Sequence, residues 1–69
     1  MDSAALEDFL KGIESMGREI HELERQVLAH PEDEDLVQKL ETMRTIHAQA
    51  KLTYYFEVTR RLDSVMFHK

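Results

Sequence analysis

The fold is decided by residues 6–27, LEDFLKGIESMGREIHELERQV. Large apolar residues recur in this stretch at alternating spacings of three and four, which is the a/d pattern of a coiled-coil helix. They are Leu6, Phe9, Ile13, Met16, Ile20, Leu23 and Val27. Such a stripe needs a cover, because large apolar side chains along one side of a helix are unfavourable in water. The stretch therefore predicts a long helix that packs against a second helix.

Composition favours an all-α chain that forms one small domain. The 69 residues include two glycines, one proline and no cysteine, while helix-forming residues dominate and strand-like alternation is absent. A chain this short buries little surface on folding. Because disulfides and thiolate metal sites are excluded without cysteine, association with another molecule is the expected source of additional stability.

Charge and hydropathy argue against several classes of partner. The net charge of −5 suits neither the phosphates of nucleic acid nor an anionic membrane surface. No apolar run approaches the roughly 20 residues that a membrane span needs, and the acidic first ten residues are unlike a signal peptide. We therefore expect a cytoplasmic protein that neither binds nucleic acid nor inserts into a membrane.

Pro31 separates the two expected helices. Proline lacks the backbone N–H and restricts the residue before it, so the first helix is expected at about 3–29 and the turn at about 30–33. The second helix then covers about 34–67, with Asp33 as N-cap or with Pro31 as its first residue. So short a connection makes the helices antiparallel neighbours. The predicted fold is an all-α, coiled-coil-like antiparallel two-helix hairpin, completed by a partner or a second copy.

The second helix should supply the other side of the seam between the helices. Its inner positions are Leu36, Leu40, Met43, His47, Ala50, Tyr54, Val58, Leu62 and Val65. Residues 1–29 carry seven acids and three bases, whereas residues 36–69 carry six bases and three acids. An acidic helix thus folds back on a basic one. Leu10 and Leu28 lie beside the seam and are expected to widen it.

Two positions at the seam leave alternatives open. His47 is either a polar layer that sets the register or responds to pH, or a partly buried histidine with an ordinary hydrogen bond or a wet edge. Gly12 and Gly17 flank the seam as glycines tolerated at the surface, unless Gly17 is a point where another backbone approaches closely.

The C-terminal third of the chain has more apolar residues than a hairpin can cover. If the turn centres near Pro31, Leu6 lies opposite Phe56 and residues beyond about Arg60 extend past the first helix. A second apolar face, turned away from the seam, also begins at Leu52. The expected partner interface comprises Leu52, Tyr55, Phe56, Thr59, Leu62, Val65, Met66 and Phe67. Surplus apolar surface of this kind indicates binding to another protein or to a second copy. The alternative is an apolar surface without a partner, on which the tyrosines lie flat with their hydroxyls in water.

Catalytic and metal-binding motifs are not assembled in this sequence. Residues 21–25, HELER, begin like a zinc-protease helix but have arginine where the second histidine is needed. The histidines show no i, i+4 pairing, and the acidic run at 32–35 lacks the spacing of a calcium loop. We expect no enzyme activity, no catalytic or metal site and no cofactor.

Several features follow one another along the chain: a long first helix, a proline turn that enters the second helix, and a tyrosine pair. The residues concerned are Leu6, Glu7, Pro31, Leu36, Val37, Gln38, Leu40, Glu41, Ala48, Tyr54 and Tyr55. This layout resembles, over most of the chain, the small co-chaperones of type III secretion needle subunits (the YscE, SsaE and EscE type). The resemblance implies a non-enzymatic cytoplasmic hairpin that pairs with a helical-repeat (TPR-like) chaperone to hold the needle subunit, a secretion substrate, before export. It also implies that the second apolar face contacts the repeat protein.

A self-associating hairpin is the alternative. Two copies would form an antiparallel four-helix bundle that acts as a regulator or adaptor. Small RNA-binding regulators have this form, but the acidic charge of this chain does not suit RNA. The mass of the chain in solution, alone and with candidate chaperones, distinguishes the two.

Overall fold

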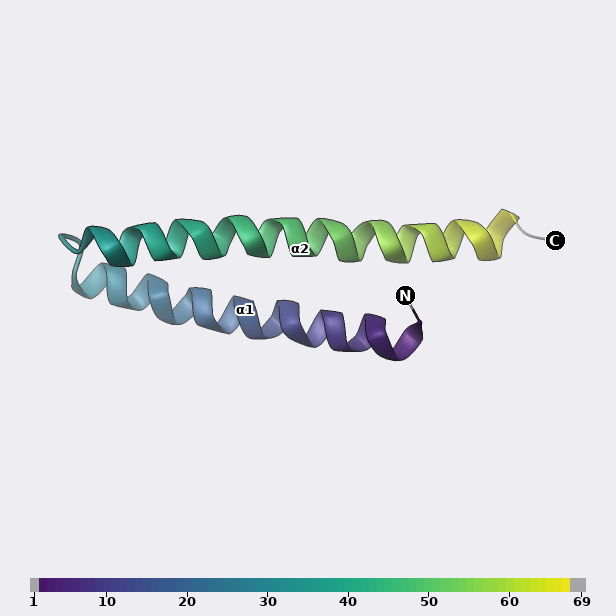
Figure 1. Cartoon of the computed structure of the whole chain (residues 1–69), viewed down its shortest axis with the longest axis horizontal. Coiled ribbons are helices and arrows are strands. Elements are labelled where there is room, and N and C mark those ends of the chain that lie inside the picture. Colours follow the sequence, from purple (N-terminus) through teal and green to yellow (C-terminus); the bar gives the residue numbers. More distant parts are fainter. Residues whose placement is uncertain (1, 68–69) are drawn as a thin grey trace.

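The computed structural model describes residues 2–67 and consists of two helices that run antiparallel, side by side (Figure 1). Helix α1 spans Ser3–Ala29 and α2 spans Glu34–Phe67. The all-α two-helix hairpin predicted from the sequence is confirmed. The expected helix bounds, about 3–29 and about 34–67, coincide with those observed.

Both helices begin at an aspartate cap. The Asp2 carboxylate accepts a hydrogen bond from the backbone N–H of Ala5 at 2.7 Å, and the Asp33 carboxylate accepts one from the N–H of Leu36 at 3.2 Å. Each cap satisfies an N–H that has no partner within its own helix. Of the two starts considered for α2, the structure has the Asp33 cap, with Glu34 as the first helical residue.

The hydrophobic core lies in the half of the hairpin nearest the turn. Ile20 and Leu23 of α1 and Leu40 of α2 are buried together. Val27, Leu36 and Met43 pack around them and are partly buried. Ile13 is also buried, about two turns closer to the N-terminus. Packing is therefore tight near the turn and sparser toward the open end.

The molecule is a rod rather than a compact globule. Its extents are 58 × 17 × 14 Å and its radius of gyration is 16.2 Å, against about 11 Å for a compact chain of this length. Helix α2 has 34 residues and α1 has 27, so the yellow end of α2 extends past the start of α1 (Figure 1). One chain thus leaves the end of α2 without a neighbouring helix.

Two interhelical contacts define how the helices are paired. Gly17 lies against the imidazole of His47, whose Nε2 is 3.7 Å from where a Cβ on Gly17 would stand. Closer to the turn, Arg44 donates to the carboxylate of Glu24 at 2.9 Å. At Gly17, then, α1 meets a side chain and not the backbone of α2. Nothing lies within 4 Å of a Cβ on Gly12, so this position is a tolerated surface glycine.

Two expectations about packing are wrong. Phe56 does not face Leu6, because its side chain is 67% exposed while Tyr54 turns inward and is half-buried; residues two apart on a helix point about 200° apart. Leu28 does not widen the seam, since it is 82% exposed. It lies in the last turn of α1, about 100° around the helix from Val27.

Candidate functional site

The inner face of α2 covers the stripe of α1. Of the residues expected at the seam, Leu62 and Val65 are exposed and the others are buried or half-buried in the hairpin. On α1 these are Leu6, Phe9, Ile13, Met16, Ile20, Leu23 and Val27, and on α2 they are Leu36, Leu40, Met43, His47, Tyr54 and Val58. Among the residues whose side chains are described, no buried polar side-chain atom lacks a hydrogen-bond partner. The seam is thus occupied within one chain and is not free to bind another molecule.

The opposite side of α2 exposes a row of large apolar residues, which we call the outer face: Leu52, Tyr55, Phe56, Thr59 and Leu62. Tyr55 and Phe56 are each 67% exposed, and Leu52 and Leu62 are exposed by more than half. Thr59 lies among them and is exposed as well. These are the residues expected at a partner interface, and the hairpin itself does not cover them.

The geometry of a helix explains why one segment has two apolar sides. Leu52, Tyr55, Phe56 and Thr59 lie within about 100° of one another around the helix and form one stripe, and Leu62 lies at its edge, between this stripe and Val58. Tyr54 and Val58 belong to a second stripe on the far side of the same helix, and they are half-buried against α1. The outer face is therefore a second seam without a second helix.

Beyond the outer face, the end of α2 is uncovered for a different reason. Val65 continues the inner stripe but is 78% exposed, because α2 extends past the start of α1. The side chains of Met66 and Phe67, which were expected at the same interface, lie outside the described residues.

The accessible area of the chain is larger than its mass requires. It amounts to 5601 Å², against about 4,500 Å² for a compact monomer of 8.1 kDa. The difference of about 1,100 Å² exceeds the roughly 800 Å² that each partner buries in a standard protein–protein interface. The hairpin therefore has enough surplus surface for one such interface.

Comparison with protein-family models, curated proteins and solved structures gives no match to this chain.

Three charged residues, Glu57, Arg60 and Arg61, lie on α2 near the outer face. The guanidinium of Arg60 donates to the carboxylate of Glu57 at 2.6 Å, and Arg61 lies 3.6 Å from the same carboxylate. The hydrogen bond from Arg60, with the nearby positive charges, lowers the pKa of Glu57 below its ordinary value and raises that of Arg60. The Glu57 side chain is only 17% exposed, whereas that of Arg60 is 68% exposed. The cation is thus presented to solvent and the anion is turned away from it.

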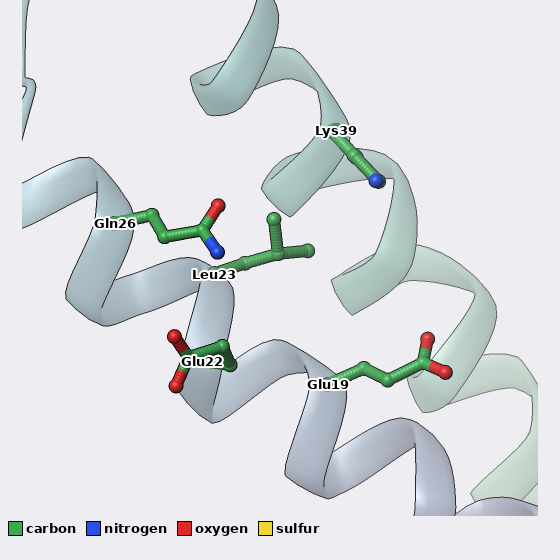
Figure 2. Close-up of a pocket in the computed structure, with 5 residues that line it drawn as sticks. All are labelled: Glu19, Glu22, Leu23, Gln26 and Lys39. Atoms are coloured by element: carbon green, nitrogen blue, oxygen red, sulfur yellow. The ribbon is translucent and has the colours of Figure 1, made fainter.

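A shallow hollow lies between the helices near the turn (Figure 2). It is lined by Glu19, Glu22, Leu23, Gln26 and Lys39, with a volume of about 300 Å³. Leu23 extends from α1 toward α2 at its base, while the four polar residues are exposed around it. The hollow is open to water and brings together no nucleophile with a neighbouring base. It is the gap left where long polar side chains border the core.

Residues 2–67 contain neither a cluster of metal ligands nor a membrane-spanning stretch. Within this range no three His, Cys, Asp or Glu side chains gather as metal ligands would. Over the same described range, neither helix has a stretch that is both apolar and long enough to cross a membrane.

Sequence reasoning missed the ion pairs of Glu57 with Arg60 and Arg61, and the pair between Glu24 and Arg44. The spacing of Glu57, Arg60 and Arg61 at i, i+3 and i+4 is a signal that would have found the first. The pair between Glu24 and Arg44 had no such signal, because its partners are twenty residues apart and meet only when the register of the hairpin is known.

Proposed function

We propose that this chain is a non-enzymatic protein-binding module, and that the outer face of α2 is where its partner docks. The observation that carries the proposal is the exposure of Tyr55 and Phe56 beside Leu52 on a chain with surplus surface. Aromatic residues are enriched in the buried centres of protein interfaces and are poorly placed in water. A partner that covered this row would remove the exposed side chains of Leu52, Tyr55 and Phe56 from water.

We further propose that the partner is a helical-repeat chaperone and that the pair acts in the cytoplasm. This part rests on the resemblance to the co-chaperones of type III secretion needle subunits. The hairpin fold, the proline turn and the exposed aromatic residues on the second helix all support it. In this role the chain would help to hold the needle subunit before export.

The test replaces Tyr55 and Phe56 together by serine. Serine has about the same helix propensity as tyrosine and phenylalanine, and both side chains are exposed in the isolated chain, so helicity by circular dichroism should stay unchanged. Candidate helical-repeat chaperones from the same genome are co-expressed with the tagged chain. We expect a one-to-one complex with the original chain and none with the double variant.

Leu28→Ser is the matched control. Leu28 is even more exposed than Tyr55 but lies on α1 next to the turn, far from the outer face. This variant should form the complex as the original chain does. A complex that survives the double change in α2, or one that is lost with Leu28→Ser, would place the interface elsewhere.

Self-association remains the second candidate function, favoured by the same surplus area. Two hairpins that paired through their outer faces would form a four-helix bundle. The isolated chain would then sediment as a dimer, and the double serine variant would sediment as a monomer. A chain that is monomeric alone and forms a complex only with a second protein favours the first proposal.

A further inference from the structure

We infer that the partner's docking surface is an apolar groove or helix stripe with an acidic rim, and not a second copy of this chain. The inference rests on the proposed function, since it names the chemistry of the molecule that covers the outer face. It is carried by the charges on the two edges of that face. The apolar centre supplies binding energy, and these edges decide which partners fit.

Both edges of the outer face are cationic. Relative to Leu52, Lys51 points about 100° to one side around the helix and Arg60 about 80° to the other. Both residues are exposed. The remaining base of the segment, Arg61, lies toward the seam with its side chain 31% exposed. An approaching partner therefore meets an apolar row with a positive charge on either side.

The two acids of residues 51–63, Glu57 and Asp63, cancel only part of the positive charge at the edges of the outer face. Glu57 is held by Arg60 on the inner side, and Asp63 lies at the C-terminal end of the face. Arg60 has five N–H donors in a fixed fork, so it can bind a second carboxylate while it keeps Glu57. Residues 51–63 carry three bases and two acids, in contrast to the acidic chain as a whole.

The net charge of −5 does not cancel this local field. The excess of acid lies on α1 and in the turn at 32–35, and α1 packs behind α2 as seen from the outer face. Lys51 and Arg60 are both exposed, whereas Arg44, two turns from Lys51 on the same side of α2, is paired with Glu24 of α1 at 2.9 Å. A partner on the outer face is therefore exposed mainly to Lys51 and Arg60.

A second copy fits this face poorly. Its own outer face has the same excess of base over acid, so two copies that paired through this face would offer no acidic rim to Lys51 and Arg60. A protein with carboxylates at the edge of an apolar groove can cover the apolar residues of the outer face and pair with Lys51 and Arg60 beside them.

The test uses two synthetic amphipathic helical peptides as probes. Both carry leucine at heptad positions a and d; one has glutamate at e and g, and the other has lysine. Binding to the full chain is measured by calorimetry at physiological salt. We expect the glutamate peptide to bind about tenfold tighter or more, and Lys51→Glu combined with Arg60→Glu to abolish or reverse this preference.

Lys39→Glu is the control matched to Lys51→Glu alone, because it makes the same charge change on α2 about three turns from Lys51. It should retain the preference for the glutamate peptide. Lys51→Glu alone should reduce the preference while leaving the pair between Arg60 and Glu57 in place, and circular dichroism establishes that each variant is folded.

Four results would overturn the inference: equal affinities, tighter binding of the lysine peptide, no binding of either peptide, or dimerisation of the chain that protects Phe56. Tighter binding to vesicles of phosphatidylglycerol than to the glutamate peptide would assign the face to a membrane instead. The double serine variant separates the two proposals. If it loses both peptides and these had bound equally, the outer face is a binding site without an acidic partner; if it binds both as the original chain does, the proposed function fails as well.

Discussion

Gly12 and Gly17 of α1 look alike in the sequence, but a Cβ added at each position would have different neighbours. A Cβ on Gly12 would meet nothing, and one on Gly17 would make ordinary van der Waals contact with the ring of His47. Replacing either by alanine removes a helix penalty of about 1 kcal/mol. We expect both Gly12→Ala and Gly17→Ala to raise the free energy of unfolding measured with urea. A loss of stability in Gly17→Ala, with a gain in Gly12→Ala, would mean that His47 packs more tightly against α1.

Leu23 and Glu24 are neighbours on α1 with very different roles in stability. Leu23 is 6% exposed in the core, so Leu23→Ala should cost about 2–5 kcal/mol. Glu24 accepts a hydrogen bond from Arg44, but both side chains are close to half exposed, and such a pair contributes only about 0–1 kcal/mol. Urea unfolding should therefore separate Leu23→Ala sharply from Glu24→Gln. Similar losses for the two variants would contradict the assignment of the core.

At the scale of the element, Asp33 fixes where α2 begins. Its carboxylate accepts from the N–H of Leu36, so Asp33→Ala should lower the free energy of unfolding by about 1 kcal/mol. Asp33→Asn keeps an acceptor and serves as the control, with a loss only slightly above zero. Equal losses in the two variants would mean that charge in the acidic turn matters more than the cap.

The end of α2 should respond to acid through Glu57. Its pKa lies below the ordinary value of 4.5, mainly because Arg60 donates a hydrogen bond to the carboxylate. A carboxyl whose pKa is lowered by folding stabilises the protein above its unfolded pKa, and this stabilisation is lost as pH falls through the lower folded value. In Arg60→Ala the pKa of Glu57, followed by NMR, should rise toward 4.5, and the acid-dependent loss of stability should become smaller. Arg44→Ala is the control and should leave the titration of Glu57 unchanged.

Helix α1 and the turn could be predicted from the sequence almost completely. One narrow stripe of apolar residues specifies a single buried side, and proline with a following aspartate specifies where one helix ends and the next begins. Helix α2 is harder, because its apolar residues around Tyr54–Phe56 lie on two sides. The pattern shows that both sides exist, but only the structure places Tyr54 against α1 and leaves Phe56 in solvent.

The pairing between the helices was the least predictable feature at this scale. Centring the turn on Pro31 gave the approximate level of each residue but assigned the wrong side chain opposite Leu6. Contacts such as that of Gly17 with His47 depend on how α1 and α2 are rotated toward each other, and a single sequence has no signal for this rotation. The exposure of Leu28 also depends on this rotation, because only the side of the last turn of α1 that faces α2 is covered.

At the scale of the whole molecule, the hairpin is long, thin and only partly covered. Among the residues whose side chains are described, four hydrophobic residues are less than a tenth exposed, which is a small core for a chain of 69 residues. A partner that covered the outer face would bury more apolar surface. Because such a partner binds only the folded state, it would also raise the free energy of unfolding. The same surface would thus serve recognition and stability together.

The central claim is that one chain folds into a hairpin and leaves Tyr55 and Phe56 in solvent for another protein to cover. Relaxation of their ring protons by a soluble paramagnetic agent, measured by NMR on the isolated chain over a range of concentrations, tests it most directly. We expect both rings to relax as strongly as the side chain of Leu28, at every concentration. Rings protected to the same extent as Ile20 would mean that the chain, or a second copy of it, already covers the outer face.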